Sequence, residues 1–265
     1  MVQSFLLLCI LIRKEKFFVS IELFDSGETK MKILILSANG GIGNAIVGEC
    51  LRRFPDANII GTYRRTYSEA VHQDITWFKV DLSSESEVEQ LSKETGNVDW
   101  IINCTGFLHD EQKGPEKNIS SLSHDFFIEN INRNTIPTLL LAKYFTKILK
   151  QSASPKVAVL SAKVGSIEDN QLGGWYSYRC AKAALNMLIK TISIEWHRVL
   201  PKGVIIALHP GTTDTSLSKP FQANVPPEKL FSTQKVAFDL LNVIEGANVE
   251  GSGDFYNYAG EKLPW

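Results

Sequence analysis

Short apolar runs alternate along the chain, from residue 31 onward, with longer segments of helical periodicity. The runs that predict strands are 32–36, 58–62, 75–80, 98–103, 156–161, 203–208 and 254–258. The segments that predict helices lie near 42–53, 85–95, 124–150, 175–199 and 227–245. Several strands are apolar at nearly every position, which is typical of parallel strands covered on both faces. The pattern predicts an α/β fold: a single-domain, doubly wound parallel sheet of about seven strands with helices on both faces.

The first thirty residues stand outside this alternation, so we interpret 1–30 as an appendage and 31–265 as one domain. The apolar run 5–12 is shorter than the ~20 residues that span a bilayer. Basic residues follow this run instead of preceding it, and no small-residue cleavage site is present, which argues against a secretory signal. We expect the folded domain to begin at Met31 and interpret the appendage as lying upstream of the true start, with membrane attachment through 5–24 as the alternative.

Composition narrows the function classes. The 265 residues include 28 basic and 29 acidic side chains, and 44% are hydrophobic. This balance excludes a disordered chain and gives no electrostatic footprint for nucleic acid. The four cysteines, Cys9, Cys50, Cys104 and Cys180, lack the spacing of a metal site or a disulfide framework. We therefore expect no metal, and a reducing, cytoplasmic compartment.

Ligands of a doubly wound sheet bind beyond the carboxyl ends of its strands, so the residues that follow each strand are the candidates. The first strand is followed, at the start of a helix, by Ser37, Asn39, Gly40, Gly41, Ile42 and Gly43. Glycines there let the backbone approach a pyrophosphate, and the helix N-terminus offers free N–H donors. The spacing is not G-x-G-x-x-G, so the phosphate loop is of another type. A tight turn that binds nothing remains the alternative.

The second strand is followed by Arg64 and Arg65, where an NAD-selective site would carry an acidic residue. A guanidinium suits a 2′-phosphate, so the cofactor we predict is NADP(H) in preference to NAD(H). After the third strand, Asp81 and Leu82 are candidates for the adenine edge. After the fourth, Asn103 is a further candidate, and Gly106 would let the backbone pass close to the cofactor. Taken singly, these four residues also fit helix caps or turns.

Tyr178 and Lys182 lie four residues apart at the start of the helix that follows the fifth strand, and so on one helix face. A nearby ammonium stabilises a phenolate, which would lower the pKa of Tyr178 and make it a general acid/base. Tyr258 and Lys262 have the same spacing, but in a glycine-containing segment near the chain end. After the sixth strand, threonine hydroxyls and backbone groups could face a carboxamide or phosphate; the residues are Pro210, Gly211, Thr213 and Thr215.

Together these residues resemble the short-chain dehydrogenase/reductase family. The motifs that carry the resemblance are SANGGIG (37–43), Asp81, NCTG (103–106), Asn134, Ser161, YSYRCAK (176–182) and HPGTTDT (209–215). They cover about 31–265, and the segments from Val164 and from His209 look nearest to the C-factor and sniffer-like carbonyl reductases. The resemblance implies a Rossmann-type sheet and an NADP-dependent oxidoreductase that interconverts a small carbonyl compound and its alcohol.

The resemblance also implies residue roles. Tyr178 would carry the proton to or from the substrate oxygen, and Lys182 would hold the nicotinamide ribose. Asn134 would support a water chain for proton resupply, and a serine would hydrogen-bond the substrate oxygen. Members commonly carry Ser-Ser after the fifth strand, whereas Ala162 stands second here; we assign Ser161, with Ser166 in reserve. Ser37 also departs from the family, because the phosphate loop usually begins with glycine.

Two functions from different classes follow. The first is an NADPH-dependent carbonyl reductase whose substrate loops, 107–120 and 212–230, form an apolar pocket. The residues that would line it are Phe107, Leu108, Trp175, Leu217, Phe221 and Val225. The second is a cofactor-binding signalling protein of C-factor type with little turnover. By the same resemblance, the long helices 124–150 and 175–199 would pair in a homodimer or homotetramer.

Overall fold

The computed structural model describes residues 30–65, 72 and 74–265. Nearly all of the expected appendage, 1–30, and all of the alternative membrane anchor, 5–24, therefore lie outside the described residues. In the part of the chain that is described, no helix has the length and apolar character needed to span a membrane.

A seven-stranded sheet forms the centre of the molecule, with the strand order β3-β2-β1-β4-β5-β6-β9 and every pair parallel. Its strands are β1 (Lys32–Leu36), β2 (Asn58–Tyr63), β3 (Thr76–Lys79), β4 (Trp100–Asn103), β5 (Lys156–Leu160), β6 (Val204–His209) and β9 (Phe255–Asn257). The predicted α/β class and parallel sheet are confirmed. The strand order reverses between β1 and β4, and such a switch point is where doubly wound sheets bind ligands.

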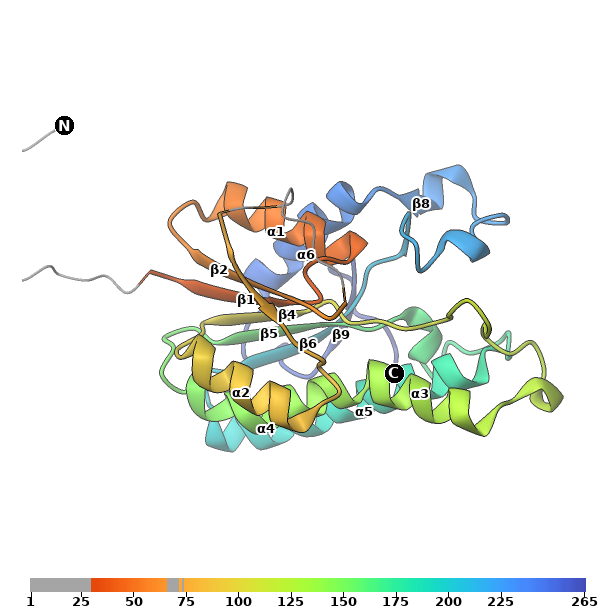
Figure 1. Cartoon of the computed structure of the whole chain (residues 1–265), viewed down its shortest axis with the longest axis horizontal. Helices are drawn as coiled ribbons and strands as arrows, with labels where there is room; N and C mark the ends of the chain where they lie inside the picture. The colour runs from red at the N-terminus through yellow and green to blue at the C-terminus, as the bar shows by residue number, and fades with distance from the viewer. Residues whose placement is uncertain (1–29, 66–71, 73) are drawn as a thin grey trace, which may run out of the picture.

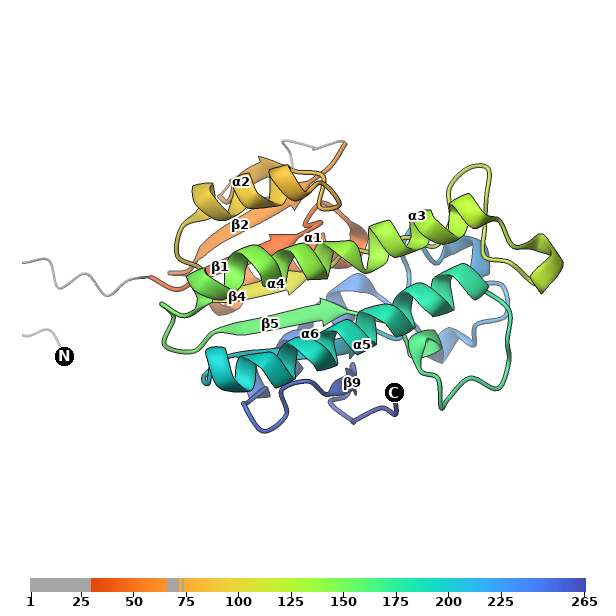
Figure 2. The ribbon, with the colours of Figure 1, turned by 90° about the horizontal axis from the view of Figure 1, so that it is seen from below.

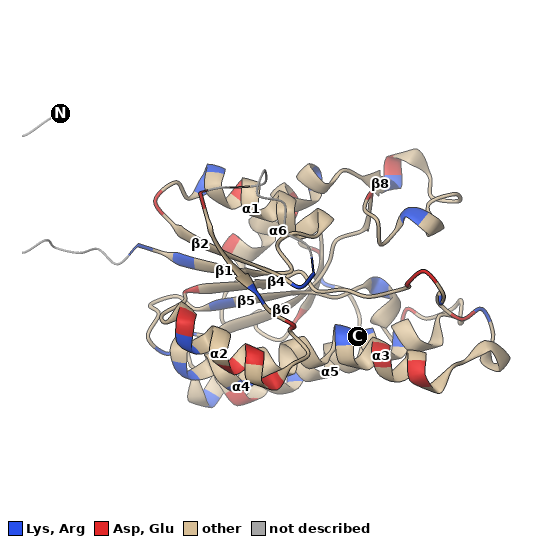
Figure 3. Ribbon diagram, viewed as in Figure 1, with Lys and Arg blue, Asp and Glu red and all other residues tan. Residues whose placement is uncertain are grey.

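Helices cover both faces of the sheet (Figure 1). Helices α1 (Gly41–Arg53) and α6 (Thr233–Gly246) pack together on one face. The other face carries α2 (Glu85–Thr95), α4 (Ile136–Leu149) and α5 (Tyr176–Val199), with α3 (His124–Asn134) leading into α4 (Figure 2). Acidic residues predominate on α2, whereas the charged residues of α4 are lysines (Figure 3).

Two hydrophobic cores lie on opposite faces of the sheet, because successive side chains of a strand point to opposite sides. In β1, Leu34 and Leu36 enter the core beneath α4 and α5, whereas Ile33 and Ile35 enter the core beneath α1 and α6. All four side chains are fully buried. Burial on both faces explains why the strands are continuous apolar runs.

The predicted helix 124–150 is two helices, α3 and α4, that meet at Thr135. Pro137 has no N–H to donate to the carbonyl of Arg133, so the helical hydrogen-bond ladder is interrupted there. The Thr135 hydroxyl donates to the Ala181 carbonyl oxygen of α5 at 2.9 Å. The interruption is therefore hydrogen-bonded to the second turn of α5.

The predicted helix 227–245 begins later, at Thr233. The Ser232 hydroxyl caps it by accepting a hydrogen bond from the Lys235 N–H at 3.2 Å. The residues before the cap form a 3₁₀ turn and the short strand β8 (Leu230–Phe231), which pairs with β7 (Thr212–Thr213). The sequence did not predict this two-stranded ribbon, which fixes both ends of the 214–229 excursion beyond the sheet (Figure 1).

Candidate active site

The loop between β1 and α1 leaves the first N–H groups of the helix available. The N-cap is Gly40, no side chain caps the helix, and its first turn carries no acidic residue. A Cβ on Gly43 would lie 2.3 Å from the Ser37 carbonyl oxygen, and one on Gly41 would lie 2.7 Å from the Thr215 methyl carbon. Both glycines are therefore required for close packing, and the uncapped N-terminus can bind an anion.

Ser37 adopts the left-handed backbone conformation, with φ of 55°. Its N–H donates to the Thr62 hydroxyl at 3.0 Å, and its carbonyl accepts from the Gly40 N–H at 3.0 Å. Glycine adopts this conformation without strain, whereas a residue with a Cβ does not. The positive φ is the physical reason why the family that the sequence resembles usually has glycine at this position. Serine adopts the same turn at a cost in backbone strain.

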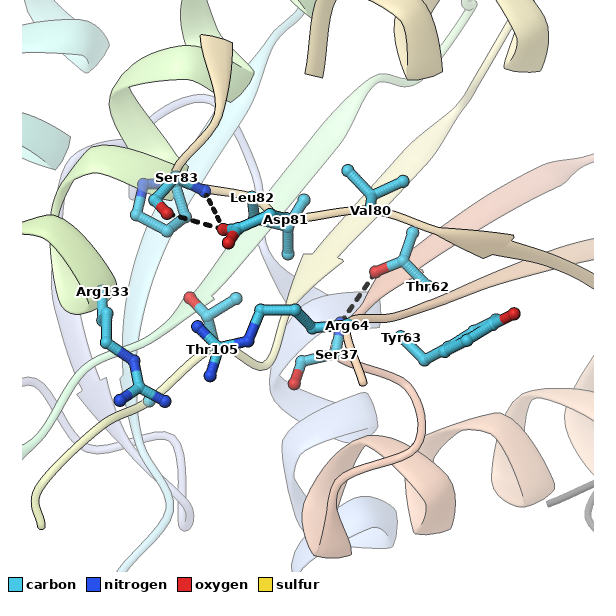
Figure 4. Close-up of a pocket in the computed structure, with 12 residues that line it drawn as sticks. Ser37, Thr62, Tyr63, Arg64, Val80, Asp81, Leu82, Ser83, Thr105 and Arg133 are labelled. Carbon is cyan, nitrogen blue, oxygen red and sulfur yellow. Dashed lines mark hydrogen bonds between the residues drawn. The ribbon is translucent and has the colours of Figure 1, made fainter. Parts of the chain in front are cut away.

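A pocket opens beyond the carboxyl ends of β2, β3 and β4, near the strand-order switch (Figure 4). Its lining residues are Ser37, Thr62, Tyr63, Arg64, Val80, Asp81, Leu82, Ser83, Thr105, Gly106, Arg133 and Pro137. The predicted residues Ser37, Arg64, Asp81, Leu82 and Gly106 are therefore brought together. Arg65 lines an adjoining, more open basin with Arg64.

Asp81 is oriented within this pocket by Ser83, whose N–H and hydroxyl donate to Asp81 Oδ1 at 3.0 and 2.6 Å. Burial opposes ionisation of the carboxyl group, but these hydrogen bonds and the guanidinium groups of Arg64 and Arg133 prevail and lower the pKa of Asp81. The pocket therefore combines a carboxylate held by its own loop with two cations.

Asn103 lies behind the pocket and is fully buried. Its side chain donates to the Thr138 hydroxyl and accepts from the Thr105 N–H, both at 3.0 Å. It shapes the loop after β4 instead of lining the pocket with its side chain. Arg133, Thr105 and Pro137 line the pocket but were missed; the position of Arg133 directly before Asn134 is the only signal for it in the sequence.

Tyr178 and Lys182 lie on the buried face of α5, with 7% and 2% of their surfaces exposed. The Lys182 Nζ lies 5.8 Å from the centre of the Tyr178 ring and donates to the Leu160 carbonyl oxygen at 3.0 Å. Among the described residues the Tyr178 hydroxyl has no hydrogen-bond partner, although the residue is buried. The hydroxyl therefore keeps its hydrogen-bonding capacity for a ligand.

Desolvation controls both groups in the protein alone. Burial lowers the pKa of Lys182 to about 7 and raises the pKa of Tyr178. The expectation that an ammonium lowers the pKa of Tyr178 is therefore not met in the protein by itself. The physical reason is that the amine is deeply buried and directed at a backbone carbonyl.

Glu116, which the sequence analysis missed, caps the helix that carries Tyr178. The N-cap of α5, Trp175, has φ of 51° and provides no side-chain cap. Glu116 Oε2 accepts from the Ser177 N–H at 3.1 Å, and Oε1 accepts from the Ser177 hydroxyl. The Glu116 carbonyl accepts from the Trp175 N–H at 2.5 Å. This carboxylate, 5% exposed, comes from the irregular loop after β4.

The serine and asparagine candidates each have buried partners. The Ser161 hydroxyl donates to Asn186 Oδ1 at 2.5 Å, and the Ser166 hydroxyl donates to the Trp265 carbonyl at 3.1 Å. Asn134 accepts from the Phe107 N–H at 3.0 Å and donates to the Phe107 carbonyl at 2.8 Å. Within the described chain none of the three is hydrogen-bonded to Tyr178.

The segment after β6 contacts the phosphate loop. Gly211 has φ of 73°, and the Thr215 methyl packs against Gly41. The Thr213 hydroxyl is enclosed and has no hydrogen-bond partner in the part of the chain that is described. His209 ends β6, and burial lowers its pKa to about 4, so it is neutral at pH 7. The unsatisfied Thr213 hydroxyl is a hydrogen-bonding group left for a ligand.

A row of aromatic rings extends from Tyr178. The ring centres of Tyr178 and Trp175 are 6.3 Å apart, those of Trp175 and Phe221 are 5.0 Å apart, and those of Phe221 and His109 are 5.6 Å apart. His109 Nε2 also contacts the Leu217 carbonyl at 3.1 Å. The row joins the 107–120 and 212–230 loops, to which the sequence analysis assigned the substrate pocket; Phe107 and Leu108 of that assignment are buried.

No group of three or more His, Cys, Asp or Glu residues that could bind a metal occurs within residues 30–65, 72 and 74–265.

The model of the short chain dehydrogenase family matches residues 31–226. A 1-hydroxy-2-glutathionyl-2-methyl-3-butene dehydrogenase of Rhodococcus sp. (strain AD45) is 33% identical over 193 residues, covering 70% of this chain and 78% of that protein. The C-signal protein of Myxococcus xanthus is 31% identical over 172 residues, covering 64% of this chain and 95% of that protein.

Solved structures show the same fold. The NADPH-bound carbonyl reductase from chicken fatty liver superposes with a TM-score of 0.78 at 23% identity, covering 89% of this chain and 99% of that one. The resemblance inferred from the ordered strand-end motifs is thus confirmed by independent matches in sequence and fold. The chain belongs to the short-chain dehydrogenase family and is an oxidoreductase of that family.

Proposed function

We propose that this protein is an NADPH-dependent carbonyl reductase in which Tyr178 is the general acid/base. The observation that carries the proposal is the combination of a Tyr178 hydroxyl without a hydrogen-bond partner among the described residues, a buried Lys182 on the same helix face and an arginine-lined pocket at the switch point of the sheet. That combination requires residues from several separate segments of the chain.

The residues present fit a phosphorylated dinucleotide. The uncapped N-terminus of α1 suits the pyrophosphate, and Arg64 suits a 2′-phosphate. The enclosed Thr213 hydroxyl, which lacks a partner among the described residues, suits the carboxamide. A cofactor bound there would supply the hydride. The solved carbonyl reductase of the same fold is an NADPH complex, which supports the choice of NADP(H).

The chain's own groups then handle the proton. In reduction, the Tyr178 hydroxyl donates its proton to the oxygen of the carbonyl substrate, and the resulting phenolate must be stabilised. Lys182 is the cation within reach, because its amine lies 5.8 Å from the Tyr178 ring. We retain Ser161 as the serine that assists and Asn134 as the residue that supports proton resupply. In the structure the Asn134 side chain hydrogen-bonds to both the N–H and the carbonyl oxygen of Phe107.

The substrate we propose is a small carbonyl compound with an aromatic or other flat apolar group. Trp175 and Phe221, with ring centres 5.0 Å apart, form the wall next to Tyr178. Aromatic faces gain dispersion and offset-stacking energy from a flat apolar partner. His109 at the end of this wall adds a polar boundary.

The test is steady-state reduction of a panel of aromatic and aliphatic carbonyl compounds with NADPH and with NADH. Tyr178→Phe should lower kcat at least ~100-fold while leaving NADPH binding, measured by tryptophan energy transfer, within about twofold. Tyr258→Phe is the matched control, because Tyr258 has the same spacing to a lysine but lies near the chain end. Unchanged turnover in Tyr178→Phe would refute the proposal.

A second candidate is a cofactor-binding signalling protein with little turnover, and the 31% identity to a protein named C-signal favours it. It predicts tight NADPH binding with no reduction of any compound in the carbonyl panel. Turnover that depends on Tyr178 would exclude it.

We also propose that the protein forms a homodimer or homotetramer through the long helices. Their outer faces carry exposed apolar side chains, including Leu139 of α4 and Met187 and Ile194 of α5. Light scattering tests this: the mass of the assembly should fall in Ile194→Glu.

We propose a cytoplasmic location. Three cysteines of the described chain, Cys50, Cys104 and Cys180, are free thiols, which fits a reducing compartment.

A further inference from the structure

Arg133 is held in a defined orientation at the end of α3. Its guanidinium carbon lies 3.6 Å above the centre of the Phe107 ring, and Nη1 donates to Glu129 Oε1 at 3.0 Å. Its remaining N–H groups have no hydrogen-bond partner among the described residues. Stacking on a buried ring fixes the plane of the guanidinium before any ligand arrives.

Arg133 and Arg64 line one pocket from different elements. Arg64 follows β2 and Arg133 comes from α3, and Figure 4 shows both side chains at this pocket. Asp81, the carboxylate of this pocket, is hydrogen-bonded to Ser83 and to neither arginine. Two cations thus line one pocket, and no carboxylate of the described residues is hydrogen-bonded to Arg64.

This arrangement is unfavourable without an anion. Burial, and then the charges of Arg64 and Arg65, lower the pKa of Arg133, although Glu129 opposes the shift. The ion pair with Glu129 involves only one nitrogen of a side chain that is 24% exposed. An anion of two charges placed between the two guanidinium groups would relieve their repulsion and hydrogen-bond to both.

We propose that Arg133 is a second phosphate-binding arginine, which binds the 2′-phosphate of the cofactor's adenosine together with Arg64. The inference rests on the proposed function, because it takes this pocket as the adenosine site of NADP(H). A phosphomonoester carries about −1.5 to −2 charges at pH 7 and three acceptor oxygens, so it can accept from two guanidinium groups at once. A free 2′-hydroxyl can neutralise neither cation.

A purely structural role of Arg133 would give a different experimental result. A cation in the last turn of a helix is favourable in itself, and so are the Phe107 stack and the Glu129 pair. If Arg133 served only these contacts, its replacement would lower stability and affect phosphorylated and unphosphorylated ligands equally. Ligand selectivity therefore separates the two roles.

The experiment measures calorimetric binding of adenosine 2′,5′-bisphosphate and adenosine 5′-monophosphate to the full chain. Neither ligand contains nicotinamide, so the result does not depend on turnover. The variants are Arg133→Gln, Arg133→Lys, Arg64→Gln and the control Arg52→Gln, whose exposed arginine pairs with Glu49 on the outside of α1. We expect Arg133→Gln to reduce the preference for the bisphosphate about 10- to 100-fold and Arg133→Lys to retain part of it.

Each outcome has one meaning. If the unmodified protein does not bind the bisphosphate more tightly than the monophosphate, the choice of NADP(H) in the proposed function is refuted. If it does, and Arg64→Gln loses the preference while Arg133→Gln keeps it, the proposed function stands and the role of Arg133 is overturned. Equal weakening of both ligands by Arg133→Gln and Arg133→Lys, with a lowered melting temperature, also overturns it. Loss of preference in Arg133→Gln, with Arg52→Gln unchanged, supports it.

Discussion

Removal of the Glu116 carboxylate should loosen the start of the helix that carries Tyr178. Helix α5 has no cap of its own, because Trp175 is left-handed and provides no side-chain acceptor. Glu116 supplies two acceptors to Ser177, the residue before Tyr178. In Glu116→Ala the buried Ser177 hydroxyl and its N–H both lose their partner.

The size of the effect follows from these contacts. Hydrogen bonds to a charged group contribute about 1.5–3 kcal/mol each, and a helix cap about 0.5–2 kcal/mol, with overlap between the two. We therefore expect Glu116→Ala to lower the free energy of unfolding by about 2–4 kcal/mol. Glu116→Gln can still accept from the Ser177 N–H and donate to its hydroxyl, and loses mainly the charge–dipole attraction, about 1 kcal/mol.

The assay combines urea unfolding with single-substrate kinetics. Because Tyr178 directly follows Ser177, fraying of the first turn should lower kcat at least ~10-fold in Glu116→Ala, even where the protein is folded. Glu111→Ala is the matched control, since Glu111 is an exposed carboxylate of the same loop. Destabilisation below about 0.5 kcal/mol in Glu116→Ala, or equal loss in the Ala and Gln variants, would refute this reasoning.

Three further substitutions test other parts of the site. Ser37→Gly should raise the melting temperature and increase the free energy of unfolding by up to about 1 kcal/mol, because it relieves the backbone strain at φ of 55°. Ser37→Ala keeps a Cβ and should bring no gain, so equal melting temperatures of the two variants would contradict the argument from strain. Lys182 has a pKa of about 7 in the folded protein, below that of an unfolded lysine, so its cost is fully present below pH 7 and disappears as the pH rises through about 10.5. Urea unfolding should therefore show stability rising with pH in this window, by up to ~1.4 kcal/mol per unit, and Lys182→Met should remove that part of the slope. Phe221→Ala should raise KM for aromatic carbonyl compounds about 10-fold without changing NADPH binding; an equal rise for aliphatic ones would argue against the aromatic wall.

The sequence predicted the sheet because each strand is buried on both faces, which leaves a continuous apolar run such as Ile33 to Leu36. It also predicted which positions gather at one edge, since parallel strands end on the same side. The sequence did not predict the direction of the side chains at those ends. Asn103 and Ser161 lie at the ends of neighbouring strands, yet both side chains hydrogen-bond to buried partners.

Glu116 and Arg133 escaped the sequence analysis for a different reason. Neither lies directly at the end of a strand, and Glu116 is 61 residues from its partner Ser177 in the sequence. A lone carboxylate in an irregular loop, or a lone arginine in an amphipathic helix, carries no periodic or motif signal. Only the tertiary structure shows that the carboxylate caps a helix that has no cap of its own, and that the arginine lines the same pocket as a second arginine.

The loop after β4 joins these separate observations. Its Gly106 lines the pocket that also contains Arg64 and Arg133. Its Phe107 forms two backbone hydrogen bonds with the Asn134 side chain and stacks against the Arg133 guanidinium. Farther along, His109 contacts the 212–230 loop, and Glu116 caps the helix of Tyr178. One irregular segment therefore contacts the proposed phosphate pocket, the aromatic wall and the helix of Tyr178. A displacement of this segment would alter all three together. We therefore expect substitutions of the residues that make these contacts to change cofactor binding and turnover jointly, whereas Phe221, outside the segment, should affect substrate binding alone.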